Sequence, residues 1–336
     1  MNAPMSTVTP FLRRNALALF VLAYASSAAM LHPGVFMDIF PMYVRKLVVL
    51  SPLISFLALL SVMIARYRSE GALCPLLAQA ALKVFWPALF MCLGFSAFTT
   101  FKLAIPGVVP FYLDPVLADL DAMLHGAQPG LVLHKLLPEV LEWPLTLVYG
   151  PLWAVVWVGG FFAVAVYGDR QLRRRYWWTC ALSLFGLGTV LATALSSVGP
   201  IYYEAVYGDP RYSDLTAAIF ASGPGGQVKG VSTYLWTTYT TGSNSFGTGI
   251  SAMPSMHVAV ATVQTLAAFS VSRILGAVLG CFALCIQFGS VYLGWHYALD
   301  GYVSALFVAC VWCAVSALQT RRKAAGAMAE PDGLTA

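Results

Sequence analysis

The chain has 336 residues, of which 59% are hydrophobic and only 10% charged, with a formal net charge of +5. An ordinary soluble domain has roughly a quarter of its residues charged, so this composition excludes a soluble globular protein. The mean hydropathy of +0.76 also excludes secreted and nucleic-acid-binding proteins, because most of the chain must have lipid as its solvent. The seven cysteines lie mainly in or beside apolar runs, which indicates buried packing rather than a disulfide framework.

Runs of apolar residues predict an all-α fold, a polytopic membrane helix bundle. A helix needs about twenty apolar residues to cross the hydrocarbon core of a bilayer. The first run follows Arg13 and Arg14 and also fits a signal peptide, but we expect it to be a membrane span. Eight runs in all have the length and hydropathy of a span, at about residues 15–31, 47–65, 82–104, 144–167, 177–197, 253–271, 275–294 and 299–318.

The spans and their connections divide the chain into four parts. We expect N-terminal membrane spans over 1–104 and an outer segment over 105–143. We expect a second membrane region over 144–320, which contains the candidate catalytic residues described below and a long outer loop at 198–252. Residues 321–336 have the composition of a disordered cytoplasmic tail.

Basic residues indicate the orientation of the bundle, because cytoplasmic loops of membrane proteins carry an excess of Lys and Arg. With a cytoplasmic N-terminus, 13 of the 19 basic residues fall on the cytoplasmic side, including the cluster from Arg170 to Arg175. The sequence therefore predicts a multi-pass protein of the cell membrane with both termini in the cytoplasm.

The two long outer connections differ in character. In the first, apolar residues recur at helical spacing from Val116 to Leu124, with Asp114 as cap and Gly126 as stop signal. This pattern predicts an amphipathic helix at the membrane surface. The second connection is rich in Gly, Ser, Thr and Tyr, and we interpret it as a lid or substrate loop.

Two histidines stand at the outer ends of predicted spans, where a polar side chain is costly and often functional. His257 follows Pro254 and Ser255 at a predicted helix start, where free backbone N–H groups and the helix dipole favour a phosphate. His296 precedes Asp300 by four residues, a spacing at which a carboxylate on a helix can orient the imidazole. Each histidine alone could equally be a structural residue at a helix end. Because both spans begin on the outer side, we expect the three side chains to meet in one extracytoplasmic active site.

These residues carry a resemblance to a known family. Pro254-Ser-Met-His257 resembles the Pro-Ser-Gly-His motif of the type 2 phosphatidic acid phosphatase superfamily, and His296-Tyr-Ala-Leu-Asp300 resembles its His-x3-Asp motif. The resemblance extends over about residues 177–318. The segments 114–130 and 199–203 are similar to the branch of the inositol phosphorylceramide synthases, the aureobasidin-resistance proteins. The resemblance implies a six-helix phosphatase-like core that follows additional N-terminal helices.

The same resemblance implies a lipid phosphotransferase with a phosphohistidine intermediate. His296 would attack a membrane lipid phosphoester, Asp300 would orient it, and His257 would protonate the leaving alcohol. The phosphoryl group would then pass to an alcohol acceptor such as inositol, or to water. This chemistry requires no metal and no other cofactor.

The sequence departs from the superfamily at the basic residues that bind phosphate. The Lys and Arg of its Lys-x6-Arg-Pro motif are replaced by Ala192 and Gly199, and the Ser-Arg before the second histidine is replaced by Gly289-Ser290. The loss favours the synthase-like branch over a plain phosphatase, yet some group must still neutralise the phosphate. The candidate substrate-binding groups are Arg211 and Lys229, helped by Tyr202, Tyr203, Ser255 and the backbone amides around 247–251.

Three other functions remain open at the level of sequence. A lipid phosphate phosphatase would use the same residues with water as the acceptor. A metal-dependent hydrolase would use His257, His296 and Asp300 as ligands. A non-catalytic lipid-binding membrane protein would bind the lipid without turnover. No residue specifies the lipid headgroup, the acceptor or an oligomeric state.

Overall fold

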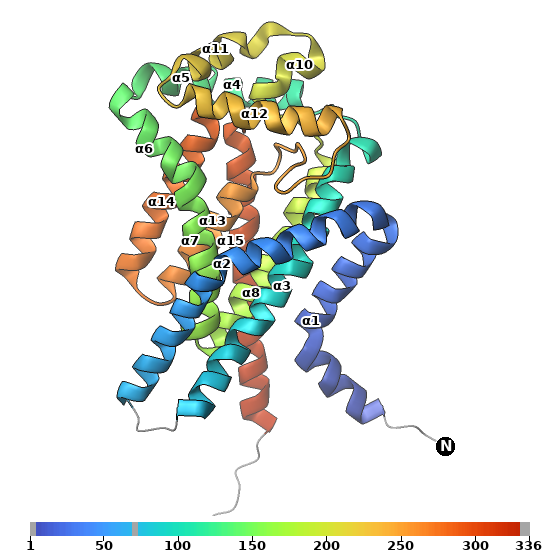
Figure 1. Cartoon of the computed structure of the whole chain (residues 1–336), viewed down its shortest axis with the longest axis vertical. Coiled ribbons are helices and arrows are strands. Elements are labelled where there is room, and N and C mark those ends of the chain that lie inside the picture. The colour runs from blue at the N-terminus through green and yellow to red at the C-terminus, as the bar shows by residue number, and fades with distance from the viewer. Residues whose placement is uncertain (1–4, 69–72, 330–336) are drawn as a thin grey trace, which may run out of the picture.

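Long helices packed side by side form the body of the protein. The computed structural model describes residues 5–68 and 73–329, and every regular element in these ranges is helical, which confirms the predicted all-α bundle. Figure 1 shows the first turn of α1 (Met5–Leu31) and the last turn of α15 (Ala298–Ala329) at one end of the bundle, and a layer of short helices at the other. The other long helices are α2 (Pro33–Arg68), α3 (Leu73–Val108), α7 (Trp153–Tyr167), α8 (Arg170–Phe185), α13 (Met256–Phe269) and α14 (Arg273–Tyr292).

The helices agree with a multi-pass membrane protein. Six segments of the described chain are long and apolar enough to cross a membrane, and two shorter apolar helices, 15–31 and 256–269, accompany them. Together they correspond to the eight apolar runs of the sequence. Two of the six segments combine several elements. One consists of η1 (Glu139–Leu141), α6 (Glu142–Leu147), the π-helical turn η2 (Val148–Leu152) and α7. The other consists of α8, the π-helical turn η3 (Gly186–Leu191) and α9 (Ala192–Ala194).

Helix α2 runs obliquely to its neighbours. Figure 1 shows its first half crossing the bundle in front of α3 and α7 before the second half descends. Pro41 and Pro52 lie inside this helix, and a proline bends a helix because it removes one backbone hydrogen bond and clashes with the preceding turn. The crossing half carries Tyr43, whose hydroxyl lies 2.7 Å from the hydroxyl of Thr99 on α3.

Short helices cap the end of the bundle opposite to the first turn of α1. The segment 198–252, which the sequence suggests as a loop, is mostly helical. Leu215, Ile219 and Val228 are almost fully buried in one apolar cluster with residues of the bundle, so their burial outweighs the low helix propensity of the surrounding Gly, Ser and Thr. The cap consists of α4 (Asp114–His125), α5 (Pro129–Leu136), η4 (Pro200–Tyr202), α10 (Tyr203–Tyr207), η5 (Pro210–Tyr212), α11 (Ser213–Ala221) and α12 (Gly225–Thr240).

Helix α4 lies where the sequence predicts a helix, and Gly126 ends it as predicted, in the left-handed conformation with a φ of +73°. The prediction that Asp114 caps this helix is wrong, because its side chain makes no capping hydrogen bond and is fully buried. The opposite face is exposed, as expected for a helix at a membrane surface. It carries the apolar residues Val116, Leu120, Met123 and Leu124.

Helix α15 continues beyond its membrane segment. The sequence suggests disorder from residue 321, but the helix extends to Ala329, and the expectation for 330–336 lies outside the described residues. Four of the seven residues from 323 to 329 are alanine. Alanine has the highest helix propensity, so the helix propagates through this segment.

Candidate active site

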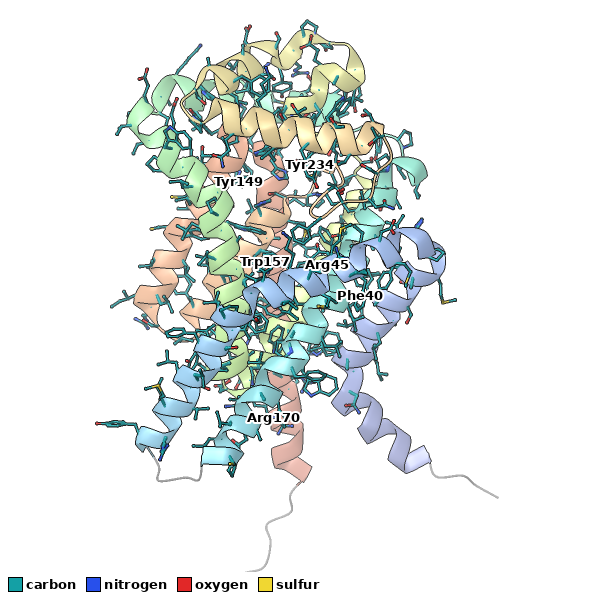
Figure 2. All side chains as sticks on the ribbon, in the orientation of Figure 1. Phe40, Arg45, Tyr149, Trp157, Arg170 and Tyr234 are labelled. Atoms are coloured by element: carbon teal, nitrogen blue, oxygen red, sulfur yellow. The ribbon has the colours of Figure 1, made fainter. Side chains whose placement is uncertain are left out.

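A cavity of about 490 Å³ lies between the bundle and the cap. Figure 2 labels three of its lining residues, Tyr149, Trp157 and Tyr234, between the level of α12 and the crossing half of α2. Most of the lining consists of aromatic and aliphatic side chains from α2, α3, η2, α7, α12 and α13. Such a lining suits the apolar part of a lipid.

His296 lines this cavity and is held by Asp300. The residue lies in the short turn between α14 and α15, and Asp300 lies in the first turn of α15. His296 Nδ1 is 3.1 Å from Asp300 Oδ2, and both side chains are buried. The same carboxylate oxygen accepts a hydrogen bond of 3.1 Å from the Tyr297 N–H. A carboxylate at Nδ1 orients the ring and leaves Nε2, which has no hydrogen-bond partner in the described part of the chain.

His257 lines the same cavity from the first turn of α13. Ser255 caps this helix by accepting a hydrogen bond of 3.5 Å from the Val258 N–H, which explains why the helix begins here. The His257 ring stacks on Tyr149 at a centroid distance of 4.6 Å and lies 4.2 Å from the Trp153 ring. Aromatic packing therefore holds His257, whereas a carboxylate holds His296.

The two histidine motifs meet at the start of their helices. The Ser255 N–H donates a hydrogen bond of 3.3 Å to the Asp300 carbonyl, which ties α13 to α15. His257 and His296 also line the same cavity. The structure thus brings His257, His296 and Asp300 together. In the residues that the structure describes, no group of three or more His, Cys, Asp or Glu side chains could hold a metal ion.

Asp121 of α4 holds the segment that follows His296. Its carboxylate accepts hydrogen bonds from the N–H groups of Ala298 and Leu299, at 3.0 and 3.2 Å. These N–H groups belong to the first turn of α15 and have no partner within that helix, so Asp121 caps α15 from a distant element. Burial raises the pKa of the Asp121 carboxyl, and the two backbone donors oppose this shift.

Asp114 connects three segments around the site. Its Oδ2 accepts a hydrogen bond of 2.9 Å from the Val198 N–H, and its Oδ1 accepts one of 2.8 Å from the Gly199 N–H. The other contacts are the hydroxyls of Tyr207 at 2.9 Å and Tyr297 at 3.0 Å. Because Tyr297 follows His296 directly, Asp114 and Asp121 together make α4 a support for the turn that carries His296.

Of the two tyrosines predicted to bind substrate, only Tyr202 lines the cavity. Its hydroxyl donates a hydrogen bond of 3.0 Å to the Ser232 carbonyl, and burial raises the pKa of this hydroxyl, so Tyr202 is a neutral group. Tyr203 is buried in the cap, among Tyr207 and Tyr212. Tyr203 and Ser255 do not contribute to the cavity lining.

The two predicted cations lie outside the cavity. Arg211 forms an ion pair of 2.6 Å with Asp119 on α4. Lys229 is exposed on α12, with its ammonium 5.8 Å from the centroid of the Phe220 ring. The structure therefore does not bring Arg211 or Lys229 to the histidines.

At two of the three positions where the superfamily carries basic residues, 199 and 290, the surrounding atoms are tightly packed. Gly199 has a φ of +85°, and a Cβ atom added there would lie 2.5 Å from the Trp295 carbonyl oxygen. Ser290 is fully buried and its hydroxyl donates to the Gln287 carbonyl over 2.7 Å. Ala192, in contrast, forms part of the cavity wall. An arginine side chain has no room at position 199.

Sequence reasoning missed Lys102, which lines the cavity from α3 together with His257 and His296. The available signal was an ionisable residue inside an apolar run, which is a functional candidate by default. The run lies far from both histidine motifs in the sequence, so no local pattern indicates that Lys102 reaches them.

One family model matches the chain. It is the model of the PAP2 superfamily, and it covers residues 116–315. No curated protein and no solved structure matches the chain. Because the matched region makes up more than half of the 336 residues and contains His257, His296 and Asp300, the chain belongs to the PAP2 superfamily.

Proposed function

We propose that the protein is an integral-membrane lipid phosphotransferase that forms a phosphohistidine at His296 and transfers a phosphoryl headgroup, as inositol phosphorylceramide synthases do. Membership of the PAP2 superfamily supports phosphatase-type or phosphotransferase-type chemistry on a lipid. The observation that carries the proposal is the geometry of His296. Asp300 holds its Nδ1, its Nε2 is unpartnered in the described chain, and its ring lines an apolar cavity that also contains His257.

In the first half of the reaction, His296 Nε2 attacks the phosphorus atom of the lipid phosphoester. A bond forms between Nε2 and phosphorus, and the bond between phosphorus and the leaving oxygen breaks. His257 donates a proton to that oxygen, so the leaving group departs as a neutral alcohol. Asp300 stabilises the positive charge that develops on the His296 ring.

In the second half, an acceptor hydroxyl attacks the phosphohistidine. Neutral His257 takes the proton of the acceptor, and the bond between phosphorus and Nε2 breaks, which restores His296. An alcohol acceptor such as inositol gives a transferase, whereas water gives a phosphatase. The absence of the superfamily's basic motif residues at positions 192, 199 and 290 favours the transferase.

The site lies on the extracytoplasmic side in this proposal. The cavity lies at the cap end of the bundle, and the first turn of α1 and the last turn of α15 lie at the opposite end. The distribution of Lys and Arg supports cytoplasmic termini. The lipid substrate would therefore react while it lies in the leaflet that faces away from the cytoplasm.

Replacing each histidine by alanine tests the mechanism. The purified protein is incubated with a radiolabelled lipid phosphoester, and protein-bound label is measured with turnover. Label on histidine is a phosphoramidate, so it is lost in acid and retained in base. His296→Ala should abolish label and turnover, and His257→Ala should lower turnover by about 10²–10⁴-fold, the usual contribution of a general acid.

His32→Ala is the matched control, since His32 packs edge-on against Phe101 and does not line the cavity. This variant should retain label and turnover. Native turnover in His296→Ala would overturn the mechanism. If the label appears as free phosphate even with inositol or another alcohol in excess, the protein is a phosphatase instead of a transferase.

A further inference from the structure

We propose that Lys102 binds the phosphate group of the substrate, in place of the basic residues that the superfamily motifs carry and this chain lacks. The inference rests on the proposed function and adds a phosphate-binding residue to it. Lys102 lies on α3, outside the region 116–315 that the family model matches. The ligand chemistry is that of a phosphate, either within a lipid or free.

The position of Lys102 is the first support. It lies in the last two turns of α3, at the end of that helix nearest the cap. It lines the same cavity as His257 and His296. A phosphate bonded to His296 would therefore occupy the same cavity as the Lys102 side chain.

The charge balance of the cavity is the second support. Lys102 is the one Lys or Arg among the lining residues, and none of them is Asp or Glu. The ion pairs in the described part of the chain join other residues, and Lys102 takes part in none of them. A cation in an apolar cavity without a counter-charge is costly, and an anionic ligand removes that cost.

The loop that packs on Lys102 is the third support. Gly249 has a φ of +92°, and a Cβ atom added there would lie 3.1 Å from Lys102 Cγ. The backbone at this point thus runs directly against the lysine. The N–H groups of Gly249, Ile250 and Ser251 make no hydrogen bond in the described structure, and all three residues line the cavity. Unpaired amides beside an ammonium form a suitable environment for phosphate oxygens.

These groups would act on the reaction itself. The non-bridging oxygens of the phosphoryl group carry the negative charge as His296 or the acceptor hydroxyl attacks the phosphorus atom. A fixed ammonium and backbone N–H groups stabilise that charge strongly inside a cavity from which water is excluded. Lys102 would then affect both the binding of the phosphate and the rate of transfer.

Lys102→Met tests this role because it keeps the length of the side chain and removes the charge. We expect kcat/KM for a lipid phosphoester to fall by about 10²–10³-fold, the usual loss when one transition-state donor is removed. The inhibition constants of vanadate and of inorganic phosphate should rise by roughly tenfold or more. Lys102→Arg keeps the charge and should recover part of both effects.

Lys46→Met is the matched control. Lys46 is exposed and its ammonium lies 5.0 Å from the centroid of the Phe246 ring, beside the same loop, but it does not line the cavity. This variant loses the same charge and should keep native kcat/KM and native inhibition. A measurement on the native protein avoids any folding defect: vanadate should protect Lys102 from an amine-reactive reagent, read by peptide mass spectrometry.

The outcomes separate this inference from the proposed function. If His296→Ala loses turnover while folded Lys102→Met keeps native kcat/KM, the role of Lys102 is overturned and the mechanism stands. The same conclusion follows if vanadate does not change the modification of Lys102. If Lys102→Met weakens inhibition by inorganic phosphate without affecting lipid turnover, Lys102 binds only free phosphate and the inference is likewise overturned. Native turnover in His296→Ala overturns the mechanism instead.

Discussion

A glycine occupies position 199, where the superfamily motif has an arginine, and the backbone there accepts no other residue. The φ of +85° lies in the left-handed region, and an added Cβ atom would contact the Trp295 carbonyl oxygen at 2.5 Å. The Gly199 N–H donates to Asp114 over 2.8 Å. The departure from the motif at this position is therefore built into the packing of the turn that carries His296.

Restoring the motif arginine by Gly199→Arg should destabilise the protein without improving phosphate hydrolysis. With a φ of +85° and a ψ of 166°, this backbone conformation is essentially restricted to glycine and costs another residue about 1–3 kcal/mol, and the clash with Trp295 adds to that cost. Thermal unfolding in detergent measures the effect. Ala192→Lys is the comparison, because Ala192 faces the cavity and leaves room for a longer side chain. A Gly199→Arg protein as stable as Ala192→Lys would contradict this account of the turn.

At the scale of elements, α4 exposes apolar side chains on one face and buries two aspartates on the other. Its apolar face is exposed, whereas Asp114 and Asp121, one heptad apart on the other face, are buried. A single-helix pattern predicts the reverse, since polar residues usually face water. The buried aspartates are satisfied by N–H and hydroxyl groups from the segments around residues 198 and 298. Helix α4 thus supports the candidate active site as well as forming part of the protein surface.

Asp121→Ala should destabilise the protein and lower kcat. The change removes the cap of α15 and leaves the N–H groups of Ala298 and Leu299 without their acceptor. The loss of a helix cap costs about 0.5–2 kcal/mol, and the adjacent His296 turn should lose its fixed geometry. Thermal unfolding and turnover of the purified protein measure the two effects.

Asp119→Ala on the same helix is the control for Asp121→Ala. The Asp119 side chain is 73% exposed and pairs only with Arg211, and an exposed ion pair contributes about 0–1 kcal/mol. Stability and kcat should therefore stay close to native. Equal losses in the two variants would show that α4 supports the site by its presence alone and not through Asp121.

At the scale of the whole molecule, the cap and the termini lie at opposite ends of the bundle (Figure 1). Tyr67, at the end of α2, is 94% exposed at the end away from the cap. Asp214 is exposed on α11 in the cap. These two residues can report which end of the bundle faces the cytoplasm.

Single cysteines at these positions should label differently in intact cells. In a background with the seven native cysteines replaced by alanine, a membrane-impermeant thiol reagent should label Asp214→Cys directly. It should label Tyr67→Cys only after the membrane is permeabilised. The reverse pattern would place the cap and the cavity on the cytoplasmic side, which the excess of Lys and Arg at the other end argues against.

Local features of the sequence were sufficient to predict the class of fold, the eight apolar helices and the position of α4. They were also sufficient to identify the two histidine motifs. Hydrophobic run length, helical spacing and helix capping act over a few residues, so they can be read directly from the chain. The pair of His296 and Asp300 belongs to this group, because its partners are one helical turn apart.

Only the tertiary structure decided which distant residues meet at the site. It placed Lys102 in the cavity and Arg211 and Lys229 outside it, and it turned Asp114 and Asp121 toward the His296 turn. It also made the second outer connection helical through the burial of its apolar residues. These outcomes depend on packing between segments that are far apart in the chain, and such packing leaves no periodic signal in either segment.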